Sequence, residues 1–184
     1  MPPYAPTKWA GATALAVLLV QPAFAETQSV YYGNLTASAV VASPFDPGDN
    51  LFVDTFTTEH GSLSQTTTFT VNEQVEFNGL AGWIIDTANG TGPRLVGVNI
   101  DILDHWSNVV ASDTFTGVLG GFAHSSFLGS LGPGTYTLVA TGNAVRDASL
   151  DISLSFAPPV PEPATYAMLL GGFGVLAMLA RRRR

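Results

Sequence analysis

The sequence of 184 residues contains no cysteine. This absence excludes a disulfide-stabilised scaffold, a zinc site with cysteine ligands and a thiol nucleophile. Charged residues are also scarce, at 11% of the chain, compared with about 25% in a typical soluble domain. Basic residues are rarer than acidic ones, with seven Lys and Arg compared with 14 Asp and Glu. What the chain does contain is a long β-rich middle with a distinct segment at each end.

The first of these segments, residues 1–25, has the layout of a secretory signal peptide. Lys8 is the only charge before a short apolar run, and Ala23 and Ala25 put small side chains at the positions that signal peptidase reads. We therefore expect cleavage before Glu26. A permanent N-terminal anchor is the alternative, which the shortness of the apolar run disfavours.

The C-terminal segment is predicted to be a transmembrane helix. Residues 164–180 carry no charge and as a helix would reach about 25 Å, which is near the lower limit for a bilayer core of about 30 Å. A stop-transfer cluster follows, formed by Arg181, Arg182, Arg183 and Arg184. Basic clusters remain on the cytoplasmic side, so the globular part would lie outside. A plain tail anchor and a buried core helix are the alternatives.

The order of features in residues 158–184 resembles a known sorting signal. Pro161, Glu162 and Pro163 precede the apolar segment, and the arginine cluster ends the chain. This combination looks like the PEP-CTERM signal of Gram-negative bacteria that make exopolysaccharide. The resemblance implies recognition of the three motif residues by exosortase, a membrane-embedded enzyme with its own reactive cysteine. It also implies a transient membrane anchor and removal of the tail.

The remaining residues, 26–157, form a strongly acidic exported domain. They include 13 acidic residues against two basic ones, a formal net charge of −11. Such a charge repels nucleic acid and anionic polymers, so no nucleic-acid partner is expected. It is typical of a solvated acidic surface and is also compatible with binding of divalent cations.

Apolar and polar residues alternate through most of this domain, a pattern that indicates half-buried antiparallel strands. No window of 11 residues has a helical stripe. Eight or so short strands separated by Gly, Asn and Asp predict an all-β fold, an antiparallel β-sandwich or jelly roll. The clearest alternating segments are 52–57, 66–71, 94–103, 135–141 and 150–156.

A second resemblance covers most of this domain. Phe52, Asp54 and Phe56 look like the signature of the FxDxF group of PEP-CTERM proteins, in which a Gly-x-Tyr-x-Leu strand and a further glycine lie near the end of the domain. Here these are residues 134–138 and Gly142. The layout is also similar to bacterial pre-peptidase C-terminal-like β-sandwiches, which again implies a sandwich.

The three side chains of this FxDxF motif share one face of a strand. If Phe52 and Phe56 point inward, Asp54 does so as well, and a buried carboxylate needs a partner. We expect hydrogen-bond donors from a neighbouring turn, or Arg146 or Arg94. On this interpretation Asp54→Asn lowers thermal stability by a few degrees. Alternatively, the strand twists and Asp54 reaches a loop or a calcium ion.

Acidic and amide side chains in turns are the candidates for metal binding. Asp46, Asp49 and Asn50 cluster in a turn-forming segment, and Asp101 and Asp104 form another pair. Calcium takes six to eight oxygen ligands, often from several loops. The alternative is that these side chains accept hydrogen bonds from the local backbone in Asx turns. No cofactor is expected other than this possible calcium.

Neither the histidines nor the serines form a catalytic motif. His60, His105 and His124 lack the spacing of known hydrolase or metalloprotease motifs, so no enzymatic activity is predicted. Aromatic residues could instead stack on sugars or fill the core, which the sequence does not decide. They are Tyr31, Tyr32, Trp83, Trp106 and Tyr136.

These observations predict an exported, non-enzymatic protein of the cell surface or extracellular matrix. Its partners would be signal peptidase, exosortase and the membrane. The sorting signal further implies association with exopolysaccharide or biofilm. A calcium- or carbohydrate-binding module is the alternative function.

Overall fold

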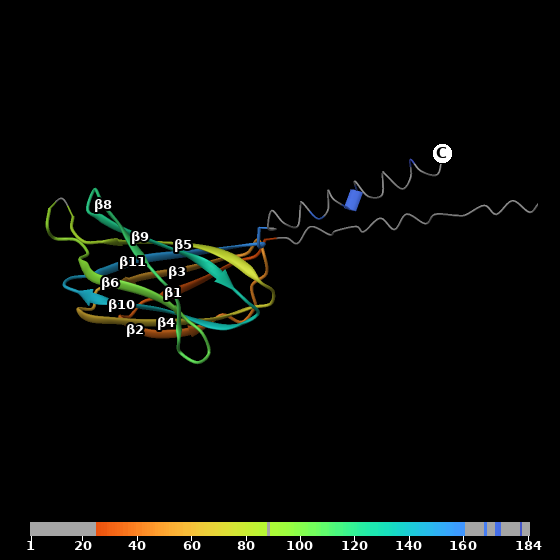
Figure 1. Ribbon diagram of the computed structural model, residues 1–184. Coiled ribbons are helices and arrows are strands. Elements are labelled where there is room, and N and C mark those ends of the chain that lie inside the picture. The colour runs from red at the N-terminus through yellow and green to blue at the C-terminus, as the bar shows by residue number, and fades with distance from the viewer. Residues whose placement is uncertain (1–24, 88, 161–167, 169–171, 174–180, 182–184) are drawn as a thin grey trace, which may run out of the picture.

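The computed structural model describes residues 25–87 and 89–160, with isolated positions at 168, 172, 173 and 181 (Figure 1). Several predictions therefore lie outside the described residues: most of the signal peptide with Ala23, the motif Pro161, Glu162 and Pro163, nearly all of the transmembrane helix predicted over 164–180, and the arginines 182–184. Within the described part, no helix is long and apolar enough to cross a membrane.

The described part of the chain consists of β-strands joined by turns. The strands are β1 (Thr27–Tyr32), β2 (Thr36–Val40), β3 (Asn50–Thr57), β4 (Gly61–Val71), β5 (Val75–Ile84), β6 (Leu95–Leu103), β7 (Val109–Ser112), β8 (Thr114–Leu119), β9 (Phe122–Leu131), β10 (Gly134–Ala144) and β11 (Ala148–Ala157).

The strands form two sheets that face each other as a sandwich (Figure 1). One sheet has six strands in the order β1-β3-β11-β5-β9-β8, and the other has five in the order β2-β4-β10-β6-β7. The all-β prediction is confirmed. The prediction of purely antiparallel sheets is wrong, because β1 pairs in parallel with β3 and β2 pairs in parallel with β4.

The parallel pairs follow from the path of the chain. It crosses from β1 in the six-stranded sheet to β2 in the five-stranded sheet, then repeats this arch with β3 and β4. Two successive arches of the same sense place their first strands parallel to each other, and likewise their second strands. The alternation of apolar and polar residues does not indicate whether two strands pair in parallel or antiparallel, because it shows only which residues share a face of a strand.

The core lies between the sheets and is apolar. In β11 every second residue is buried, from Ala148 to Phe156. Phe45, which lies in the segment before β3, packs on Phe156 with ring centroids 4.9 Å apart and on Phe69 of β4 at 6.1 Å. This aromatic contact joins the two sheets at one end of the sandwich. Burial of such rings is the main stabilising term in a domain without disulfides.

A short polar network crosses the core at another point. The Thr55 hydroxyl donates to Oε1 of Gln65 at 2.8 Å, and Nε2 of Gln65 donates to the Asn34 carbonyl at 2.8 Å. Both side chains are buried, at 2% exposure each. Since unpaired polar groups in a core are costly, this network favours one alignment of β3 against β4.

The inward face of β11 gives a direct test of the sandwich. Leu154→Ala should destabilise the protein by about 2–5 kcal/mol, because Leu154 is fully buried and its removal leaves a cavity. Leu128→Ala is the matched control, since Leu128 is 76% exposed and should cost less than about 0.5 kcal/mol. Urea unfolding followed by circular dichroism measures both. Equal costs would contradict the assigned faces.

Candidate functional site

The FxDxF motif lies on β3 with its side chains on the outer face of the six-stranded sheet. Phe52 is 39% exposed and Phe56 49% exposed, whereas the intervening Val53 is 3% exposed. The prediction that both phenylalanines point into the core is therefore wrong. Both faces of the strand carry apolar residues, but only one carries the Asp54 carboxylate. Burying the other face avoids desolvating that charge, and this decides the orientation.

Asp54 has a carboxylate, rather than an arginine, as its cross-strand neighbour. The register of β3 against β11 places it directly opposite Asp151. Arg146, one of its predicted partners, instead contacts Asp86. Burial, together with the nearby Asp54 carboxylate, raises the pKa of Asp151 above its ordinary value. Like charges directly opposite one another in a sheet are destabilising, so this pair weakens the contact between β3 and β11.

A shallow recess of about 280 Å³ lies over this carboxylate pair. Cross-strand pairing continues the row from Asp151 to Gly82 on β5 and then to His124 on β9. Gly82 has no side chain, which leaves the floor of the recess open. Phe52 and the 57% exposed Leu80 border it. The recess thus combines two carboxylates and an imidazole with apolar walls.

The loop predicted as a calcium site uses its oxygen atoms within the protein. Asp49 is 6% exposed, and its Oδ1 accepts the Glu26 N–H at 2.6 Å while its Oδ2 accepts the Asp46 N–H at 2.8 Å. Oδ1 of Asn50 accepts a hydrogen bond from Ser155 at 2.7 Å. Asp49 thus accepts backbone N–H groups, as in the alternative interpretation, whereas Asn50 contacts a side chain. Among the described residues, no group of three or more His, Asp or Glu could hold a metal ion.

The turn between β6 and β7 displays an exposed tryptophan on a fixed backbone. Oδ1 of Asp104 accepts the N–H groups of Trp106 and Asn108 at 2.9 and 2.8 Å. Hydrogen bonds from the Asn108 side chain and from these amides hold the pKa of Asp104 below its ordinary value. Ser107 has a backbone φ of 65°, a conformation that residues other than glycine rarely adopt. Trp106 is 73% exposed at the tip.

A pocket of about 330 Å³ lies beside this turn, which we call the Trp106 pocket. Its lining joins the β6–β7 turn to the start of β10, so Trp106 and Tyr136 contribute to one site. The His105 ring lies against the indole, with centroids 3.4 Å apart. The Tyr136 hydroxyl donates to the Gly132 carbonyl at 3.0 Å, which fixes the phenol.

The other aromatic candidates are divided between core and surface. Trp83 and Tyr32 are each 5% exposed, so they belong to the core. Tyr31 is 66% exposed, on the outer strand β1. Sequence reasoning therefore found the aromatic residues of the Trp106 pocket but could not separate them from buried ones.

Sequence reasoning missed a cleft of about 540 Å³ between the two sheets. Its lining includes Trp83 on β5, Val96 on β6 and Phe115 on β8, three strands that meet only through the sheet topology. Buried and exposed residues do not alternate along β8, since nearly all its residues are exposed. No local pattern could have indicated that Phe115 helps to form a cleft.

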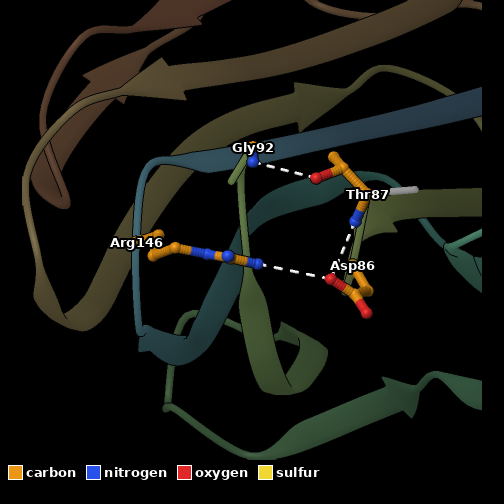
Figure 2. Close-up of polar contacts among 4 residues, drawn as sticks. All are labelled: Asp86, Thr87, Gly92 and Arg146. Atoms are coloured by element: carbon orange, nitrogen blue, oxygen red, sulfur yellow. Dashed lines mark hydrogen bonds and ion pairs between the residues drawn. The ribbon is translucent and has the colours of Figure 1, made fainter. Parts of the chain in front are cut away.

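An ion pair fixes the loop at the mouth of this cleft (Figure 2). Arg146 contacts Oδ1 of Asp86 at 3.4 Å, and the same oxygen accepts the Thr87 N–H at 2.9 Å. The Thr87 hydroxyl in turn accepts the Gly92 N–H at 2.9 Å. The three contacts hold the chain after β5 against the turn that follows β10.

The three histidines lie on separate parts of the fold. Nε2 of His60 is 4.0 Å from Asp147, His105 lies on Trp106, and His124 borders the recess on the outer face. The Thr116 hydroxyl donates to the His124 backbone carbonyl at 3.0 Å, but no histidine ring in the part of the chain that the structure describes hydrogen-bonds to a serine or threonine hydroxyl.

The Asp54–Asp151 pair predicts a stability that depends on pH. Asp151→Asn should stabilise the protein at pH 7 by a few tenths of a kcal/mol, because it removes a screened like-charge contact. A carboxyl whose pKa is raised by folding costs stability only once it ionises. The gain should therefore disappear as the pH falls below about 4.

Thermal unfolding of the two proteins between pH 3 and pH 7 measures this effect. Glu76→Gln is the control, since it also removes one negative charge from the outer face but lies away from the pair. A similar gain in both variants would mean that net charge, rather than the pair, is responsible.

Among the comparisons with known proteins, a family model identifies the C-terminal tail. No curated protein matches the chain. Among solved structures, the pre-peptidase C-terminal domain of collagenase from Bacillus anthracis is similar at a TM-score of 0.39 and 12% identity, covering 73% of this chain and 100% of that one. A family model for the PEP-CTERM protein-sorting motif matches residues 159–184. The chain therefore carries a PEP-CTERM sorting motif directly after its last strand.

Proposed function

We propose that this chain is an exported, non-enzymatic protein of the cell surface or extracellular matrix that associates with exopolysaccharide. The observation that carries the proposal is the sorting motif at residues 159–184. Such a motif implies export, a membrane-anchored precursor and processing by exosortase. Exopolysaccharide is the surrounding polymer with which a protein sorted in this way would associate.

The geometry of the domain is consistent with attachment by one end. The beginning of the described chain (red) and the end of β11 (blue) lie at the same end of the sandwich (Figure 1). The register agrees, since Asn50 pairs with both Thr27 of β1 and Ser155 of β11. A domain tethered after Ala157 would therefore direct its opposite end away from the membrane.

The segment between β11 and the motif favours access by a processing enzyme. Pro158 and Pro159 follow the last residue of β11, where they remove two backbone donors and fix φ at about −65°. Such a segment cannot continue the sheet and remains extended. Glu162 supplies the single charge of the motif.

Glu162→Ala should reduce release of the protein about tenfold in a strain with active exosortase, because the variant removes the only charge of the three-residue motif. Immunoblots of membrane and medium fractions measure precursor and product. Glu76→Gln, in the folded domain, is the control and should be released normally. Unchanged release of the Glu162 variant would contradict sorting through this motif.

A carbohydrate-binding module is the second candidate function, and the Trp106 pocket favours it. Sugar rings present apolar C–H faces that stack on exposed aromatic rings, while their hydroxyls need nearby polar groups. Trp106 offers an exposed ring on a fixed turn, beside His105 and Tyr136. The charge of −11 in residues 26–157 favours neutral or basic polymers over acidic ones.

Trp106→Ala should weaken binding to a neutral glucan about tenfold or more, as expected for a central aromatic contact. Phe115→Ala is the matched control, because Phe115 is an exposed aromatic residue at 59% and lies at the cleft instead. Binding is measured by calorimetry with a neutral glucan, an amino-sugar polymer and an acidic polysaccharide. Loss of binding only in the Phe115 variant would assign the site to the cleft and contradict the Trp106 pocket.

A further inference from the structure

The first residue of the domain is held in a fixed position by the loop 46–50. The Glu26 nitrogen donates to Oδ1 of Asp49 at 2.6 Å. The Glu26 carbonyl accepts the Asn50 N–H at 2.8 Å. Two hydrogen bonds on opposite sides of one residue thus fix where its backbone nitrogen lies. That nitrogen faces a carboxylate whose residue is 6% exposed.

The Asp49 carboxylate has hydrogen-bond donors but no cationic side chain. Its other oxygen accepts the Asp46 N–H. Residues 26–157 contain no lysine and only two arginines, Arg94 and Arg146. The ion pairs among the described residues are Arg146 with Asp86 and His60 with Asp147. A buried carboxylate without a cation is less stable than one paired with a hydrogen-bonded cation.

Cleavage before Glu26 would supply that cation at the same atom. Signal peptidase converts the Glu26 amide nitrogen into an α-ammonium group by hydrolysis of the Ala25–Glu26 peptide bond. Water provides one oxygen of the new Ala25 carboxylate and the two protons that the nitrogen gains. An α-amino group is largely protonated at neutral pH, since its ordinary pKa is about 8. The Glu26 carbonyl keeps its hydrogen bond to Asn50, so the nitrogen does not need to move.

We infer that the loop 46–50 is a binding site for the new N-terminus, in which the α-ammonium of Glu26 forms an ion pair with the buried Asp49 carboxylate. The inference rests on the export described under the proposed function. It explains why an oxygen-rich loop that suggested calcium binding has a buried carboxylate without a cationic side chain beside it among the described residues. The cation for this site is part of the protein itself.

The same loop holds the strand from which the sorting tail leaves. The Phe156 N–H donates to the Asp49 carbonyl at 3.0 Å, and the Gly48 N–H donates to the Phe156 carbonyl at 2.8 Å. The ion pair therefore stabilises the end of β11 together with the start of β1. Removal of the signal peptide would strengthen the base of the domain while the tail still anchors it.

Two forms of the tail-containing protein in detergent test this inference. One begins at Glu26, and the other begins at Ala25, where one extra residue restores a peptide N–H at Glu26. Asp49→Asn should raise the unfolding equilibrium constant about five- to tenfold more in the first form than in the second, because only the first loses an ion pair. Urea unfolding measures all four proteins. An equal effect of Asp49→Asn in both forms would overturn the ion pair.

Two further measurements keep the outcome decisive. Asp46→Asn is the control and should act equally in both forms, since its carboxylate contacts the Asn72 side chain at 3.1 Å. If the Asp49 variant does not fold, the two unsubstituted forms are compared instead. The form that begins at Glu26 should then have an unfolding equilibrium constant about fivefold lower than the form that begins at Ala25. Equal stability would overturn the inference.

N-terminal sequencing of the exported protein separates this inference from the proposed function. A first residue of Glu26 is expected. A different first residue would overturn both the cleavage position and the ammonium site. Glu26 as first residue without coupling to Asp49 would overturn the ion pair alone and leave export and sorting unaffected.

Discussion

The scarcity of cations is the constraint on which the rest of this structure depends. The exported domain has 13 carboxylates and two arginines, so most acidic side chains must remain in solvent or accept backbone N–H groups. Asp54 illustrates the first solution, because its charge keeps the FxDxF face of β3 outside. Asp104 illustrates the second, with two backbone amides bound to one oxygen. Loop shape and strand orientation both follow from these two solutions.

Two turns that border pockets of the sandwich are each held by a carboxylate. Asp104 fixes the turn that displays Trp106, and Asp86 with Arg146 fixes the mouth of the cleft (Figure 2). In each case a carboxylate orders a loop that local propensity would leave variable. Binding surfaces built on ordered loops lose less conformational entropy when a ligand binds. Asp104 and Asp86 each line the pocket beside the loop that they order.

The sequence was sufficient to predict the class of fold but not the faces of its strands. Alternating segments such as 135–141 and 150–156 coincide with β10 and β11, because period-two patterns are local. The same pattern could not decide which face of β3 is buried, because Phe52 and Val53 are both apolar and lie on opposite faces. What decided between them was the cost of burying Asp54, together with the Gln65 partner available to Thr55 on the other face.

The candidate sites were predictable only in part, for a similar reason. Trp106 and Tyr136 were recognisable as stacking residues, but their proximity depends on the pairing of β6 with β10. The cleft needed β5, β6 and β8 to be placed in two sheets, which no local signal encodes. Asp49 was recognised as an oxygen ligand, whereas its actual donors come from Glu26 and Asp46.

The pairing of β3 with β11 has a consequence for the order of events during secretion. A hydrogen bond between Ser155 and Asn50 joins residues 105 positions apart, so the six-stranded sheet cannot close until nearly the whole domain has been synthesised. Long-range pairing of this kind slows folding. A chain whose sheet closes late can remain unfolded while it is exported, because the six-stranded sheet is complete only once β11 has been added.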